Sequence, residues 1–68
     1  MIVRYHIITS GPDILYDEGR LEEAVVQMQK YLDDGEEDVR LYKEIYKSPE
    51  EAENQWFQEA ICLLAIGG

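Results

Sequence analysis

The chain has almost none of the cysteine and histidine residues that cross-link small folds through disulfides or metal ions. Its 68 residues include one cysteine and one histidine, which excludes an intramolecular disulfide and a Cys/His zinc site. A chain of this length buries only about 60% of the surface that its unfolded form exposes. The free energy gained by burying apolar surface is then nearly equal to the entropic cost of ordering the chain. We therefore expect one small domain over residues 1–68 that gains further stability as a homo-oligomer.

Reactive side chains are equally scarce. Besides His6 and Cys62 there are two serines, and no glycine-rich phosphate loop or catalytic motif. His6 shares its side of an alternating segment with Arg4, a pattern typical of an exposed or edge-packed imidazole. We interpret Cys62 as an unreactive thiol. The sequence thus predicts no enzymatic activity, no catalytic residue and no cofactor.

Basic residues and long apolar runs are the other shortages. Six Lys and Arg face fifteen Asp and Glu, for a net charge of −9, which argues against direct contact with nucleic acid or anionic lipid. The longest apolar run, Ala60 to Ile66, is far shorter than the roughly 20 residues that cross a bilayer. No charged segment followed by an apolar one opens the chain. We expect no membrane association and a cytoplasmic location.

The first half alternates and then turns helical. Residues 1–9 alternate as a half-buried strand does, residues 10–13 have turn composition, and residues 14–16 predict a second strand that closes a hairpin. From Arg20 the spacing becomes helical, and Gly35 is the expected residue after the helix end. The apolar side chains of this helix fall within an arc of about 120°: Leu21, Ala24, Val25, Met28, Tyr31 and Leu32.

Residues 39–47 fit two structures. As a strand, Val39, Leu41 and Ile45 line one side; as a helix, the apolar side chains fill an arc of about 160°. The strand is favoured because Val, Ile and Tyr prefer strands and a two-stranded hairpin is poorly stable alone.

A helix-start signal follows at Ser48. Serine suits the N-cap, Pro49 the first helical position, and Glu51 the third position of a capping box. We expect this helix to run to about Ile66 and to end at Gly67. Its apolar arc of about 180° is wider than one packing face requires: Ala52, Trp56, Phe57, Ala60, Ile61, Leu63 and Leu64.

Together these segments predict an α+β domain with the element order ββαβα. A right-handed crossover gives a three-stranded, antiparallel-type sheet in the order 2-1-3, with both helices on one face. The opposite face is expected to present one set of side chains to water or to a partner: Ile2, Arg4, His6, Ile8, Arg40, Tyr42, Glu44 and Tyr46.

Five carboxylates lie within six residues around Gly35: Asp33, Asp34, Glu36, Glu37 and Asp38. A calcium site is one interpretation, although the spacing does not match an EF-hand loop; a solvated helix end is another. In a third, the cluster presents negative potential to a basic partner, because the helix dipole disfavours acids at a helix C-terminus.

Two functions from different classes follow. In the first, the chain is a small non-catalytic regulator or inhibitor, of phage or mobile-element type, that occupies a basic surface of a partner such as a nucleic-acid-handling protein. It would bind through the five carboxylates together with Tyr42, Tyr46 and Arg4, because Tyr and Arg are enriched in interfaces. In the alternative, the chain is a structural homo-oligomer whose self-interface contains Phe57, Ile61 and Leu64, and the acid serves only solubility.

Overall fold

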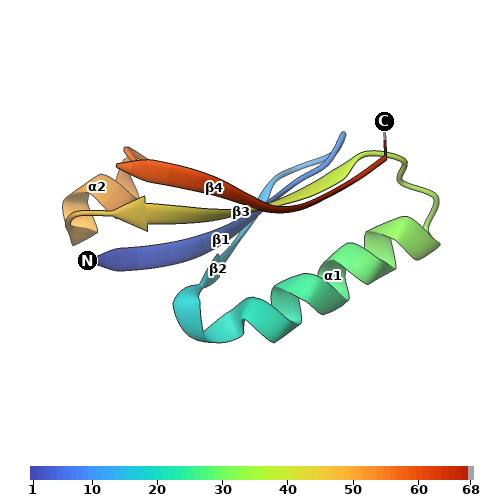
Figure 1. The fold of residues 1–68 in the computed structure, drawn as a ribbon, viewed down its shortest axis with the longest axis horizontal. Coiled ribbons are helices and arrows are strands. Elements are labelled where there is room, and N and C mark those ends of the chain that lie inside the picture. The colour runs from blue at the N-terminus through green and yellow to red at the C-terminus, as the bar shows by residue number, and fades with distance from the viewer. Residues whose placement is uncertain (68) are drawn as a thin grey trace.

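A four-stranded antiparallel sheet organises the chain. The computed structural model describes residues 1–67, and the strands lie in the order β2-β1-β3-β4 (Figure 1). Along the chain the elements are β1 (Ile2–Ile8), β2 (Ile14–Asp17), the 3-10 turn η1 (Glu18–Arg20), α1 (Leu21–Asp33), β3 (Val39–Tyr46), α2 (Pro49–Glu53) and β4 (Glu59–Ile66). The α+β class and the antiparallel sheet are confirmed, but the prediction of three strands was one strand short.

The first three strands pair as their alternation predicted. In the β1–β2 hairpin Tyr5 lies opposite Tyr16, and in the β1–β3 pair Ile7 lies opposite Leu41. The ambiguous segment 39–47 is a strand over Val39–Tyr46, because its pairing with β1 lets Val39 and Leu41 join the buried face. The predicted order 2-1-3 is therefore retained within the larger sheet.

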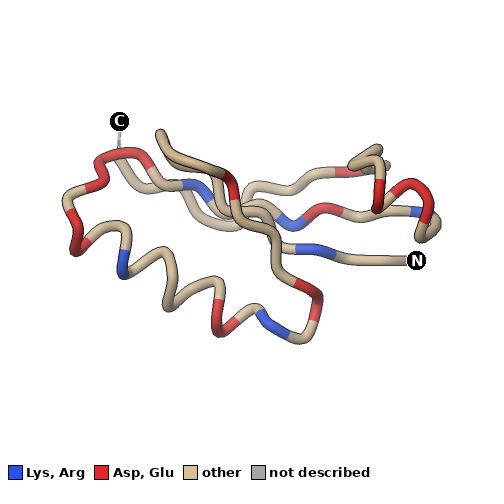
Figure 2. Tube along the Cα trace, turned by 180° about the vertical axis from the view of Figure 1, so that it is seen from behind, with Lys and Arg blue, Asp and Glu red and all other residues tan. Residues whose placement is uncertain are grey.

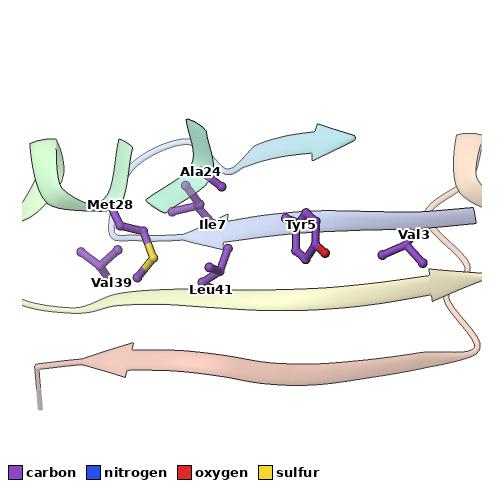
Figure 3. Packing of buried hydrophobic residues seen from close by; sticks show 7 residues of the cluster. All are labelled: Val3, Tyr5, Ile7, Ala24, Met28, Val39 and Leu41. Carbon is purple, nitrogen blue, oxygen red and sulfur yellow. The ribbon is translucent and has the colours of Figure 1, made fainter. Parts of the chain in front are cut away.

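One face of the sheet is covered by α1. Ala24 and Met28 of this helix contribute to the main hydrophobic cluster, and both are essentially inaccessible to solvent. Figure 3 shows how Met28 lies near Val39 while Ala24 lies near Ile7. The sheet contributes the other buried members of the cluster, all on the same face: Val3, Tyr5, Ile7, Val39 and Leu41. The apolar side of α1 and the side chains of β1 and β3 that face it thus form the core.

The end of α1 is a Schellman motif. The Gly35 amide donates to the Leu32 carbonyl at 3.1 Å, and the Glu36 amide donates to the Tyr31 carbonyl at 3.0 Å. Gly35 has φ +95°, a left-handed conformation that glycine adopts without steric cost. The predicted role of Gly35 is confirmed.

The predicted helix from Ser48 to Ile66 was wrong beyond its first turns. Its start is confirmed, since the Ser48 hydroxyl accepts from the Glu51 amide at 3.3 Å. The helix stops after Glu53, however, because Gln55 takes a left-handed φ of 59°. The Gln55 amide donates to the Ala52 carbonyl at 3.2 Å and the Trp56 amide to the Glu51 carbonyl at 2.9 Å, a second Schellman motif.

The two helices do not share one face, contrary to the prediction. Arg4 leaves β1 on the face opposite Val3 and Tyr5, and its Nη1 donates to the Ala52 carbonyl of α2 at 3.0 Å. A five-residue helix is too short to reach across the sheet. It closes the end of the sheet near the N-terminus, whereas α1 lies along the other face (Figure 1). Within residues 1–67, neither helix is long and apolar enough to cross a bilayer.

The substitution Gln55→Gly distinguishes the turn from the predicted continuous helix, because it should change the free energy of unfolding in opposite directions in the two. A non-glycine residue in the left-handed region costs about 1–2 kcal/mol. Glycine removes this cost, but the greater freedom of glycine in the unfolded chain cancels part of the gain. Gln55→Gly is therefore expected to stabilise the protein by about 0.5–1 kcal/mol, measured by urea unfolding. A continuous helix through residue 55 would instead lose about 1 kcal/mol, so destabilisation of that size would contradict the turn.

Candidate protein-binding site

The acidic segment 33–38 gathers at one end of the molecule. It joins α1 to β3, and the red stretch between these elements in Figure 2 marks it. The end of β4 reaches the same place, because a Cβ built on Gly67 would lie 1.4 Å from the Glu37 carbonyl oxygen. Only glycine permits this close approach of the two backbones. The loop is therefore anchored at its helix end and in its middle.

Three of the five carboxylates accept side-chain hydrogen bonds. Asp33 accepts from Gln29 Nε2 at 3.0 Å, Glu36 from the Ser10 hydroxyl at 2.8 Å, and Asp38 from Arg40 Nε at 3.3 Å. The backbone of Asp34 caps α1, and its side chain is exposed, as is that of Glu37. One ion pair, between Asp38 and Arg40, offsets only a small part of this negative charge.

A shallow hollow of about 310 Å³ adjoins the acidic segment. It places two of the predicted binding residues together, since Asp38 and Tyr42 both line it. The pKa of Arg40 is raised above its ordinary value by the adjacent Tyr42 hydroxyl and then by Asp38. The full lining is Ile8, Thr9, Ser10, Asp38, Arg40 and Tyr42.

Tyr46 and Arg4 lie outside this site. Tyr46 is completely buried, and its hydroxyl donates to Glu44 Oε1 at 2.6 Å. The Arg4 guanidinium covers the Tyr46 ring at 5.8 Å from its centroid and also bonds to Ala52. The structure thus gives the pair an internal role beneath α2, unlike the partner contacts that their residue types suggested.

A buried polar cluster surrounds Glu44 on the face opposite α1. Glu44 is only 6% exposed, and its Oε2 lies 2.8 Å from His6 Nδ1. His6 Nε2 lies 3.0 Å from Asp13 in the β1–β2 turn, so the ring ties that turn to the sheet. His6, Glu44 and Tyr46 share one face as predicted, but they were expected to face water or a partner. Instead α2 folds back towards this face, and Glu44 and Tyr46 are buried, which no local sequence pattern indicates.

This cluster holds no nucleophile within reach of His6. Cys62 pairs with Tyr42 across β3–β4, and Tyr42 pairs with His6 across β1–β3. Since neighbouring strands are about 4.8 Å apart, Cys62 and His6 are separated by about 10 Å and cannot act as a nucleophile–base pair. In the part of the chain that the structure describes, no three His, Cys, Asp or Glu side chains converge to hold a metal ion. The calcium interpretation gains no geometric support.

Alkaline pH should weaken the fold through Tyr46. Burial, followed by the bond to Glu44, raises the pKa of Tyr46 from 10.0 to about 12. A pKa that is higher in the folded than in the unfolded state gives stability that is intact below pH about 10 and is lost as pH rises towards about 12. The stability advantage of the wild type over Tyr46→Phe should therefore shrink by about 1 kcal/mol between pH 8 and pH 11, measured by urea unfolding of both proteins. A constant difference would contradict this environment of Tyr46.

The residues predicted for self-association do not form one helix face. Ile61 and Leu64 lie on β4 opposite Lys43 and Leu41, on the α1 side of the sheet. Phe57 precedes β4 and lines a second hollow on the other side, with His6, Ile8, Tyr42, Glu44 and Ala60. All three are about 40–50% exposed, because they belong to an edge strand and its approach.

No protein-family model matches the chain, and no match is found among curated proteins or solved structures. Its function is therefore inferred from its residues and their geometry.

Proposed function

We propose that the protein is a non-catalytic protein-binding module that docks on a basic surface of a partner through its acidic end. The acidic end comprises the five carboxylates Asp33, Asp34, Glu36, Glu37 and Asp38 and the adjoining hollow. The observation that carries this proposal is the anchoring of the segment backbone by a Schellman turn and of three of its carboxylates by side-chain hydrogen bonds. A charged surface held in place loses less entropy on binding than a mobile one.

The helix dipole does not favour this concentration of acid. Asp33 and Asp34 occupy the C-terminal end of α1, where the helix dipole opposes negative charge by about 0.3–1 kcal/mol for each residue. Glu37 and Asp38 extend the charge beyond the helix into exposed positions. Recognition of a positive surface explains why the chain tolerates this cost.

The hollow supplies the second part of the proposed interface. Tyr42 and Ile8 give it apolar area, and its charged lining is the pair of Asp38 with Arg40. An arginine or lysine of the partner would pack its stem on these apolar atoms while its head competes with Arg40 for the Asp38 carboxylate. Nucleic-acid-handling proteins carry such residues in grooves shaped for phosphates. The protein would then act as a regulator or inhibitor that occupies the groove.

The experiment compares two variants of equal charge. In the first, the five carboxylates of the acidic end are replaced by Asn or Gln. In the matched control, five exposed acids elsewhere are replaced in the same way: Asp17, Glu18, Glu22, Glu50 and Glu53. Both carry net charge −4, starting from −9. Tagged proteins are incubated with host lysate at low ionic strength, and the proteins retained are identified.

A partner retained by the wild type and the control but bound about 100-fold more weakly by the first variant would support the proposal. Circular dichroism checks that both variants are folded. If both variants lost partner binding equally, only the net charge of the protein would matter. If both still bound the partner, the partner would contact another surface. Either result would overturn the proposal.

A further inference from the structure

The last strand has the sequence of a central strand but lies at an edge. Strands buried on both faces read as continuous apolar runs, whereas a half-buried strand alternates. β4 reads Glu-Ala-Ile-Cys-Leu-Leu-Ala-Ile, and seven of its eight residues are exposed. It pairs with β3 on one side only (Figure 1). The backbone groups of its other side therefore have no partner strand among the described residues.

β4 also has few of the devices that keep edge strands from pairing. Natural edges are blunted by lysine, proline, inward-pointing charge or a bulge. β4 has a register shift around Leu63 but no lysine and no proline, and its one charge, Glu59, is at its first residue. By contrast, the other edge, β2, has four residues and ends in Asp17. The two edges of the sheet are thus protected very differently.

We infer that β4 pairs antiparallel with β4 of a second copy of this chain, which joins the two sheets into one of eight strands. A two-fold axis at the middle of β4 gives each copy the same eight-residue partner, so the assembly closes as a dimer. Pairing of β4 with the four-residue β2 of another copy would leave half of it open and would continue as a filament. The side chains are also compatible, since β4 is apolar except for a charge at its first residue, and two such strands can pair without burying a charge along most of their length.

The exposed apolar segment that would meet the second copy includes β4 and the residues just before it. A typical interface takes about 800 Å² from each partner, which is about a sixth of this chain's 4676 Å². Every residue from 56 to 65 is exposed, and eight of these ten are apolar. Edge-to-edge pairing would cover the free backbone edge of β4 and the parts of its side chains that meet the neighbouring strand. It would also supply the stability that a chain of 68 residues without a disulfide lacks.

The dimer does not depend on the proposed function, and the two respond to salt in opposite directions. Each copy carries net charge −9, so salt screens the repulsion between copies and should tighten the dimer. Binding of the acidic end to a basic partner should weaken over the same range. Failure of one proposal is therefore distinguishable from failure of the other.

The test is the mass of the folded chain in solution, by size-exclusion chromatography with light scattering at about 100 μM. The wild type is expected at twice the chain mass of 7.9 kDa. The double substitution Ile61→Glu with Leu63→Lys keeps the net charge and places the new carboxylate opposite Lys43, so the monomer remains stable while the apolar edge is lost. It is expected at the monomer mass. The matched control, Val25→Glu with Val26→Lys on the exposed side of α1, should remain dimeric.

A cross-link gives a second readout that needs no edge variant. Cys62 is exposed and is the fourth of the eight residues of β4, so a full antiparallel overlap brings the two Cys62 Cα atoms to within about 7 Å, where a disulfide can form. Mild oxidation of the wild type should give a covalent dimer, and Cys62→Ser should give none. A wild type of monomer mass, an edge variant as dimeric as the wild type, or a dimer whose cysteines do not cross-link would overturn the inference.

Discussion

Tyr46→Ala is expected to unfold most of the protein at room temperature. Removal of a fully buried aromatic side chain costs about 3–5 kcal/mol, and a chain of this length has roughly 3–10 kcal/mol in total. Tyr46 has no exposed surface, and its loss also removes the hydroxyl that donates to the buried Glu44. Arg4 would lose the ring on which it lies. The measurement is the free energy of unfolding in urea, followed by circular dichroism.

Tyr46→Phe separates packing from hydrogen bonding in this prediction. It keeps the ring and removes only the donor to Glu44, so we expect a loss of about 1–3 kcal/mol with the fold retained. If Tyr46→Ala unfolds like the wild type, the ring is not the buried anchor of α2 and Arg4. Tyr46 would then lie at a surface, as its position on the outer face of the predicted sheet suggested.

Met28→Ala is expected to cost about 2–5 kcal/mol. Met28 is 2% exposed and joins α1 to the sheet at the start of β3, near Val39 (Figure 3). The cavity would loosen the end of α1 that leads into the acidic segment, so partner binding should weaken along with stability. Urea unfolding measures the first effect, and retention of the partner at low ionic strength measures the second.

The matched variant for this position is Met28→Leu. It conserves volume, so a cost of less than about 1.5 kcal/mol is expected. Met28→Leu should also bind the partner as the wild type does. A Met28→Ala protein as stable as Met28→Leu would show that α1 is held to the sheet by other residues.

Much of the fold could be read from local patterns. Alternation located β1, the turn composition of residues 10–13 indicated the hairpin with β2, helical spacing located α1, and turn chemistry identified Gly35 as the residue after the helix end. For residues 39–47 a strand was favoured over a helix because Val, Ile and Tyr prefer strands and a hairpin alone is poorly stable, and the pairing of β3 with β1 confirms it. These predictions worked because each rests on one element and its immediate neighbours.

The last third of the chain shows where local patterns fail. A run of apolar residues from Ala60 to Ile66 satisfies the spacing of a buried helix and that of a strand alike. The feature that ends the helix is the left-handed conformation of Gln55. A glycine at this position would have indicated such a turn in the sequence, but the residue is glutamine. The wide apolar arc expected for a helix was the remaining hint, since an arc of about 180° exceeds one packing face. On a strand the same residues lie on both faces.

The candidate site could be predicted only in part. The carboxylates of segment 33–38 were recognisable from their density, and Tyr42 from its place on the outer face. That Tyr46 and Arg4 turn inward could not be predicted, because α2 covers them after a helix end that the sequence hides. The hollow that joins Asp38 to Tyr42 depends on the same sheet register.

Recognition through the acidic end is tested most directly by the salt dependence of partner binding. The partner retained by the wild type is purified, and its dissociation constant is measured as the salt concentration rises. We expect the affinity to fall steeply with rising salt for the wild type and for the control variant, in which five acids outside segment 33–38 are replaced. For the variant without the carboxylates of segment 33–38 it should be weak and nearly independent of salt. A wild-type affinity that does not change with salt would contradict recognition by charge.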